Sequence, residues 1–287
     1  MSERVSLASN SSDRFAARRR LKRLRIFLVL SVFIFFLFGA CVWGLQQDNV
    51  RITHIEVFGS SSLGSYGEAS EDQSLADIAR AAMQGMYFGI IPRDSIFFFP
   101  ASRIRADTLA AHSDIAAVSI FRNGLNGLSI KINDRVPITR WCGLAPTPGV
   151  EPYCYVFDAS GYIFAAAASG TETVNSFTLY APLVGETLEP LGASIAHPEK
   201  LPRAFDFARQ LDTLGSPVKH IIFQEDEVND YLTSGTRINY VLGHENDAYT
   251  ALVSARDTFN LADGSIEYID LRFDGKVYVK RRNDKVQ

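Results

Sequence analysis

The sequence lacks the short motifs that mark common catalytic and cofactor sites. It contains no HExxH pair for a metal, no GxSxG nucleophile turn and no GxxxxGK[ST] phosphate-binding loop. Its five histidines are scattered, and no two of them stand at the spacing of a metal site. One S-x-x-K stretch, Ser216 to Lys219, lacks the partner motifs of penicillin-binding enzymes and coincides with a Gly-Ser-Pro turn. We therefore expect a protein that is not an enzyme and that holds no metal and no cofactor.

Long hydrophobic runs are also absent, with a single exception. Residues 26–45 form a stretch of twenty residues without a charge, and an α-helix of that length spans about 30 Å, the thickness of the hydrocarbon layer. Residues 1–25 hold eight basic and two acidic residues, whereas the rest of the chain holds 21 basic and 30 acidic residues. By the positive-inside rule, this asymmetry predicts a single-pass protein with its N-terminus in the cytoplasm and its bulk outside.

Two other interpretations of the apolar run remain open. A cleaved signal peptide would begin in the same way, but the run is longer than usual and lacks an A-x-A-like site. A lipoprotein signal would use Cys41, but the sequence stays apolar beyond that residue as far as Leu45.

Cysteine is scarce as well, since the chain has only three. Cys41 lies inside the apolar run, and Cys142 and Cys154 lie in the part predicted to be exported, on either side of a proline-rich insert. Because thiols outside the cytoplasm are readily oxidised, this pair predicts a disulfide that closes a loop of about a dozen residues. The alternative is two buried free thiols.

The exported part has two patterns of secondary structure. Residues 52–58 predict a strand, a capping pair at Ser74 and Asp77 opens a helix, and a second helix is expected at 101–112. Two strands at 115–122 and 128–135 follow, so that this stretch has the order strand, helix, helix, strand, strand. The remainder is mostly β, with helices expected at 199–214 and 247–261. The fold class predicted for the chain is therefore α+β.

The last predicted strand covers residues 266–280. From Ile269 to Val279 every odd position is apolar or glycine, which is typical of a half-buried strand. Asp274-Gly275 is a strong hairpin signal. A two-residue hairpin there, however, would place Lys276 and Tyr278 on the core side and Val277 and Val279 outside. We therefore expect one long strand without a hairpin, whose outer edge could accept a partner strand.

Four stretches together resemble the FtsQ/DivIB family of bacterial cell-division proteins. They are ITHIEVFG at 52–59, the paired strands that run into RVPITRW at 115–141, YVFDASGYIF at 155–164 and YIDLRFDGKVYVK at 268–280. Each stretch is a weak motif alone, but their order and spacing are similar to those of the family. The chain departs from the family pattern in a long polar loop at 59–73, in the apolar FFFP at 97–100 and in the insert at 143–151.

The resemblance implies four parts. They are a basic cytoplasmic tail at 1–25, a transmembrane helix at 26–45, a POTRA domain at 50–136 with the order β-α-α-β-β, and at 137–287 a mostly antiparallel β domain with two helices. It also implies a non-catalytic divisome scaffold at the septum of the bacterial inner membrane, which binds FtsB/DivIC-like and FtsL-like proteins and controls septal wall synthesis. Neither nucleic acid nor a small-molecule substrate is expected.

The partner-binding residues expected from the terminal strand are Arg272, Phe273, Gly275, Val277 and Tyr278. Two other functions are weighed against the scaffold. The first is another membrane-anchored POTRA protein that handles polypeptides by strand addition, although no membrane β-barrel is predicted to follow. The second is a membrane-anchored wall enzyme, against which the missing catalytic motifs count.

Overall fold

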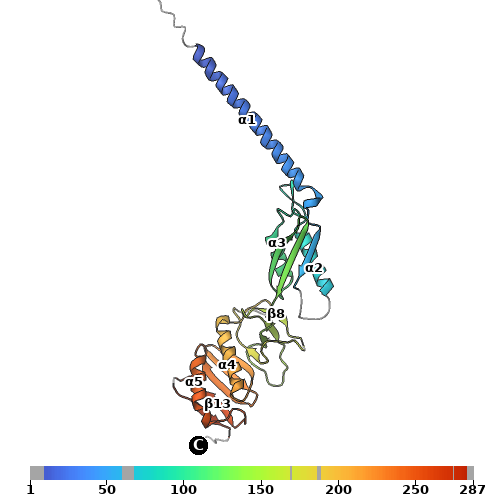
Figure 1. The fold of residues 1–287 in the computed structure, drawn as a ribbon. Helices are drawn as coiled ribbons and strands as arrows, with labels where there is room; N and C mark the ends of the chain where they lie inside the picture. Colours follow the sequence, from blue (N-terminus) through green and yellow to red (C-terminus); the bar gives the residue numbers. More distant parts are fainter. Residues whose placement is uncertain (1–9, 60–67, 169, 186–188, 274, 283–287) are drawn as a thin grey trace, which may run out of the picture. The chain divides into compact units, whose positions relative to one another are not determined.

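The structure is a computed structural model that describes residues 10–59, 68–168, 170–185, 189–273 and 275–282 (Figure 1). The chain forms two compact units, each of which is described by itself. The first extends to Ile132 but leaves out residues 109–117, which belong to the second unit together with Asn133 and everything that follows. The interpretation from the sequence put this division between residues 136 and 137.

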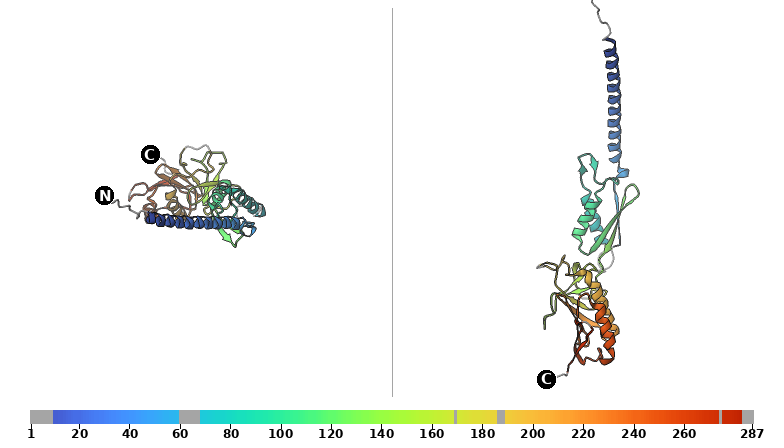
Figure 2. Two further views of the ribbon diagram at one scale, coloured as in Figure 1. Left: turned by 90° about the horizontal axis from the view of Figure 1, so that it is seen from above. Right: turned by 90° about the vertical axis from the view of Figure 1, so that its left-hand side faces the viewer.

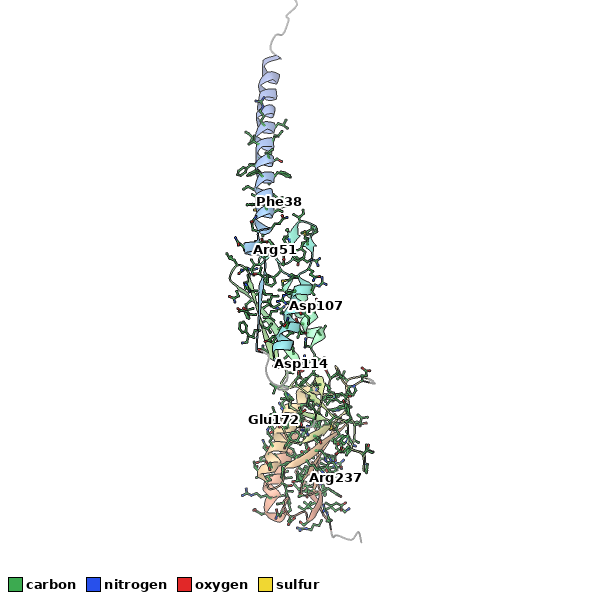
Figure 3. All side chains as sticks on the ribbon, turned by 90° about the vertical axis from the view of Figure 1, so that its right-hand side faces the viewer. Phe38, Arg51, Asp107, Asp114, Glu172 and Arg237 are labelled. Atoms are coloured by element: carbon green, nitrogen blue, oxygen red, sulfur yellow. A yellow bond between two sulfur atoms is a disulfide. The ribbon has the colours of Figure 1, made fainter. Side chains whose placement is uncertain are left out.

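The first unit begins with α1, a 36-residue helix over Asn10–Leu45. Its part Leu24–Leu45 is the one helix in the described chain that is long and apolar enough to cross a membrane, and it begins two residues before the predicted apolar run. Its apolar side chains are exposed, as Figure 3 shows for Phe38, which stands clear of the helix. A surface of this kind is unfavourable in water and suited to lipid.

The rest of the first unit packs two helices beside a three-stranded sheet. Its elements are β1 (His54–Phe58), α2 (Glu68–Ala82), β2 (Met86–Tyr87), β3 (Ile91–Pro92), α3 (Ala101–Ala111), β4 (Ile115–Asn123) and β5 (Gly127–Asp134). By the division given above, residues 109–111 of α3, 115–117 of β4 and 133–134 of β5 count with the second unit. The sheet order is β1-β5-β4, and β1 runs parallel to β5 with His54 opposite Gly127. The short strands β2 and β3 pair separately as an antiparallel hairpin, which the sequence did not predict.

The start of α2 corrects a prediction. The helix begins at Glu68, so Ser74 and Asp77 lie inside it and do not form its N-terminal capping pair. Residues 68–73 are Glu, Ala, Ser, Glu, Asp and Gln, which include no Gly or Pro to stop the helix, so it begins six residues before Ser74. The buried face of α2 is nevertheless the expected one, with Leu75, Ala79 and Ala82 in the core.

The second unit is built on a nine-stranded, mostly antiparallel sheet in the order β14-β13-β12-β11-β10-β9-β6-β7-β8. The strands are β6 (Thr139–Trp141), β7 (Tyr155–Phe157), β8 (Ile163–Ala166), β9 (Thr178–Tyr180), β10 (Val218–Gln224), β11 (Glu227–Leu232), β12 (Arg237–Val241), β13 (Ile266–Asp270) and β14 (Tyr278–Arg281). Helices α4 (Leu201–Thr213) and α5 (Glu245–Ala255) run side by side along one face, as the right-hand view of Figure 2 shows.

The main core lies between these helices and the sheet. Phe205 of α4 meets Phe157 and Phe177, and Phe207 packs on Tyr240 of β12 with ring centroids 4.5 Å apart. Alternation along the strands directs every second residue to this side. The opposite face is more polar, and there the guanidinium of Arg237, labelled in Figure 3, lies over the ring of Tyr268, 5.3 Å from its centroid.

One position breaks the apolar pattern of this core. Asp230 on β11 is fully buried, and within the described chain neither of its carboxyl oxygens has a hydrogen-bond partner. Burial, reinforced by the charge of Glu245, raises the pKa of Asp230 well above its usual range. Burial likewise raises the pKa of Tyr240, whose hydroxyl also lacks a partner in the described residues. Asp230 therefore keeps its proton to a higher pH than a carboxyl in water does.

A disulfide joins Cys142 and Cys154, the pair that the sequence singled out. It closes the loop between β6 and β7, and its sulfur-bearing side chains pack with Tyr180 and Ile222. The loop itself exposes apolar side chains, among them Leu144 and Tyr153.

Candidate partner-binding surface

The end of the chain is a hairpin, and the prediction of one continuous strand at 266–280 was wrong. Strands β13 and β14 pair antiparallel, with Ile269 opposite Val279 and Asp270 opposite Tyr278. The connection spans residues 271–277, and inside it the N–H of Lys276 donates to the carbonyl of Phe273 at 3.1 Å. Gly275 has a φ of +66°, which glycine adopts without strain. Asp274 lies outside the described residues.

The prediction of a single strand failed because it considered only a two-residue turn between two strands. A seven-residue connection removes that constraint, because after it the odd-numbered residues of the second strand can face the core again. Val277 and Val279 nevertheless face the core, as expected. Val279 stands opposite Ile269, a core residue, and Val277 packs against the core from the connection.

Arg272 fastens the connection to the sheet. Its guanidinium donates to Asp270 on β13 at 2.6 and 2.9 Å and to Glu227 on β11 at 2.7 Å. The hydrogen bonds from Arg272 hold the pKa of the Asp270 carboxyl below its usual range. Arg272 was predicted to contact a partner directly, but the guanidinium is already engaged by two carboxylates. Its geometry suits a positioning role.

Phe273 and Tyr278 form an exposed aromatic pair next to this anchor. Their rings meet edge to face with centroids 5.4 Å apart, and the two residues are 53% and 48% exposed. Aromatic residues that remain exposed on a folded surface are common anchors of protein interfaces. The structure thus brings together four of the five predicted residues, Arg272, Phe273, Gly275 and Val277, in the connection, and Tyr278 at the start of β14.

Strand β14 is the last strand of the sheet, and no described strand pairs with its outer side. The N–H of Arg282 donates inward, to the carbonyl of Ser265 on the neighbouring strand. Because backbone groups alternate in direction along a strand, the N–H and C=O groups of Val279 and Arg281 point outward. Val279 and Arg281 are therefore the backbone donors and acceptors of this edge, and the sequence prediction did not include them.

The opposite end of the sheet is closed. At β8, the N–H of Ile163 donates to the carbonyl of Ala193 at 2.9 Å, and the carbonyl of Ile163 accepts from Gly192 at 2.8 Å. Ser113 adds a hydroxyl bond to the carbonyl of Phe164 at 2.9 Å. One edge is thus covered by the chain itself, whereas the edge at β14 is available for strand addition.

A groove of about 870 Å³ borders the aromatic pair. One wall is α5 with the residue before it, and includes His244, Asp247 and Ala251; the other is the connection, with Phe273 and Val277. The small side chains Ala248, Ala251, Ser254 and Ala255 leave room along the helix, so an elongated segment could lie there. None of the α5 residues was predicted from the sequence to bind a partner, because small side chains on a helix carry no signal without the neighbouring loop.

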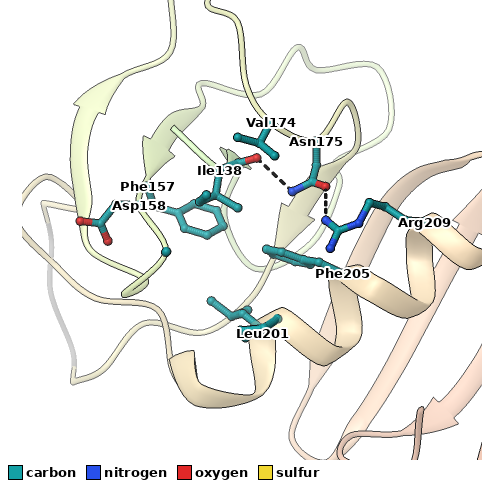
Figure 4. A pocket seen from close by; sticks show the side chains of 10 residues that line it. Ile138, Phe157, Asp158, Val174, Asn175, Leu201, Phe205 and Arg209 are labelled. Carbon is teal, nitrogen blue, oxygen red and sulfur yellow. Dashed lines mark hydrogen bonds between the residues drawn. The ribbon is translucent and has the colours of Figure 1, made fainter. Parts of the chain in front are cut away.

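A second, smaller pocket of about 240 Å³ lies at the start of α4 and is lined mainly by apolar side chains (Figure 4). Its polar side chains are already satisfied. The amide of Asn175 donates to the carbonyl of Ile138 at 3.1 Å and accepts from Arg209 at 2.7 Å, and Arg209 also pairs with Asp206. The pocket is below the usual size for a cofactor and offers no free polar group in the described chain.

The remaining candidates for chemistry are held in structural contacts. The hydroxyl of Ser216 is buried and lies 3.1 Å from both the Thr233 hydroxyl and the N–H of Ser234, which ties the turn before β10 to the turn after β11. His220 stacks on Tyr231 with ring centroids 4.5 Å apart. No group of three His, Cys, Asp or Glu side chains in the described residues is arranged to hold a metal ion.

Comparisons with known proteins assign no family. A scan against protein-family models finds no match, and no curated protein matches the chain.

Proposed function

We propose that the chain is a membrane-anchored, non-catalytic scaffold of the FtsQ/DivIB type. It binds FtsB/DivIC-like and FtsL-like division proteins outside the bacterial inner membrane and thereby controls septal wall synthesis. The observation that carries the proposal is the open edge of β14, which lies beside an exposed aromatic pair and a groove, at the end of a sheet whose other edge is covered.

The arrangement of the first unit supports the same assignment. Helix α1 contains a segment suited to a membrane span, and the basic tail before it favours a cytoplasmic N-terminus. The order β1, α2, α3, β4, β5, with β1 parallel to β5, is consistent with the POTRA domain that the resemblance implies.

Binding would proceed by strand addition. A partner segment pairs with the backbone of Val279 and Arg281, while its side chains meet Phe273 and Tyr278 on the adjoining surface. Residues 280–282 are Lys, Arg and Arg, so the partner segment is expected to be acidic. Lys280 is already paired with Glu267 at 3.0 Å, whereas Arg281 and Arg282 donate to backbone carbonyls and are the freer cations.

The experiment compares Val279→Pro with Val279→Ala. Both variants remove the valine side chain, but only proline removes the outward N–H, and it does so without taking a donor from the β13–β14 pairing. The lost hydrogen bond and the partner carbonyl left without a donor cost about 1–3 kcal/mol, which corresponds to a Kd about 5- to 150-fold weaker for Val279→Pro than for Val279→Ala.

The assay is a pull-down, followed by titration, with the exported segments of an FtsB/FtsL-like pair, and circular dichroism checks that both variants fold. Equal affinity of the two variants would show that the backbone of this edge is not used. In cells, depletion of the protein should produce filaments that fail to septate, and normal division after a clean deletion would count against the proposed function.

A further inference from the structure

The hairpin of β2 and β3 ends in an unusual turn. The N–H of Ile90 donates to the carbonyl of Tyr87 at 3.1 Å, and the two central residues, Phe88 and Gly89, have φ values of +52° and +70°. Positive φ at both central positions is the signature of a type I′ turn, which favours Asn or Asp before the glycine. A bulky residue at positive φ is strained, and Phe88 is also 96% exposed, so packing among the described residues does not explain it.

Phe88 is the most exposed member of a group of apolar side chains. The others are Met86 and Ile90 in the same hairpin and Phe97 and Phe98 in the turns that follow β3, all of them 41–53% exposed. Five large apolar side chains within thirteen residues are more than the single exposed residues found on most surfaces. Arg93 lies in the same segment but outside the apolar group, with its guanidinium 5.1 Å from the centre of the Tyr87 ring.

Hydrogen bonds tie this group to the end of the apolar helix. Gln46 is the first residue after the candidate span Leu24–Leu45, and its side-chain amide donates to the carbonyl of Ile90 at 3.4 Å. The N–H of Ile96 donates to the carbonyl of Val50 at 2.9 Å, and Arg51 pairs with Asp94 at 2.6 Å. The hairpin tip is therefore held beside the C-terminal end of α1, where the candidate membrane span ends at Leu45.

We propose that this apolar group, Met86, Phe88, Ile90, Phe97 and Phe98, docks into the outer lipid interface of the membrane that α1 crosses. The inference rests on the membrane anchorage in the proposed function. Phenylalanine and leucine side chains bury at the boundary between headgroups and acyl chains, and the side chain of a phenylalanine at a hairpin tip reaches that boundary first. Arg93 stays at the level of the lipid phosphates, where its charge remains solvated while its stem covers apolar surface. The first unit then has two attachments to the bilayer, α1 and the hairpin.

The test places a nitroxide label on the full chain in lipid nanodiscs. Cys41→Ser removes the free thiol, Cys142 and Cys154 stay in their disulfide, and single variants Phe88→Cys, Leu125→Cys and Trp43→Cys carry the label. Leu125 lies in the turn between β4 and β5 of the same unit and is 62% exposed, so it serves as the water-exposed control. Trp43 near the end of α1 is the lipid control.

The readout is the ratio of collisions with lipid-soluble oxygen to collisions with a water-soluble nickel chelate. The proposal expects this ratio at position 88 to resemble that at position 43 and to exceed that at position 125 several-fold. A ratio at position 88 equal to that at 125, with position 43 in lipid, overturns lipid docking and leaves the proposed function intact. A water-like ratio at position 43 overturns the anchor, and with it both proposals.

Discussion

The buried carboxyl of Asp230 provides the sharpest prediction about stability. In the folded chain it is enclosed between the sheet and α5, near Tyr240 and Glu245, and burial raises its pKa. In the unfolded chain the same carboxyl titrates near pH 3.9. Replacing Asp230 with Asn keeps the shape and removes the charge.

The direction in which the free energy of unfolding changes with pH follows from proton binding to the folded and unfolded states. Between the unfolded pKa and the raised folded pKa, the folded state holds a proton on Asp230 that the unfolded state has released. The stability of the unmodified chain therefore falls as the pH rises through this window, by at most about 1.4 kcal/mol per pH unit for one proton. Asp230→Asn has no such loss, so its advantage over the unmodified chain is small near pH 4 and grows as the pH rises through this window.

The assay is urea unfolding of the detergent-solubilised chain at several pH values, followed by the fluorescence of Trp141, which is buried in the second unit. Asp226→Asn is the matched control, because Asp226 lies exposed in the turn between β10 and β11. The stability difference between Asp230→Asn and the unmodified chain should depend on pH, and that for the control should not. A difference that stays constant from pH 4 to pH 7 would refute the reasoning.

Two further predictions concern the same unit. Replacing Cys142 and Cys154 with Ser opens a loop of 12 residues and should lower the free energy of unfolding by about 3 kcal/mol. Urea unfolding measures this change, and the unmodified chain under reducing conditions is the control. An unchanged unfolding midpoint would contradict the prediction. Arg272→Ala leaves Asp270 without its main partner and should cost about 1–2 kcal/mol at pH 7. Because the pKa of Asp270 is depressed in the folded state, the cost of Arg272→Ala should vanish as the pH falls through that pKa. At pH 7, Arg272→Lys should restore part of the lost stability. A cost that is the same at pH 2 and pH 7 would argue against the ion pair.

Strong periodic patterns in the sequence predicted their elements well. Strand β11 has the predicted bounds, 227–232, and α4 lies within two residues of its prediction, because each has an unbroken apolar face and clear turn residues at its ends. The three-residue strand β9 was missed, since so short a segment shows no period and depends on its neighbours in the sheet.

The candidate site was predicted in part. The connection with Phe273 and Val277 was identified, but its shape was not, because the length of a turn is decided by contacts such as those of Arg272 with Glu227, 45 residues away in the sequence. The edge donors of Val279 and Arg281 depend on which strands pair, and the sequence of a single strand does not carry that information.

The most direct test of strand addition at β14 is amide hydrogen exchange of the chain with and without the exported segments of an FtsB/FtsL-like pair. The account predicts slower exchange on binding at Val279 and Arg281, whose N–H groups point outward, and unchanged exchange at β8, whose edge is already covered. Tight binding with no change at Val279 and Arg281 would contradict strand addition at this edge.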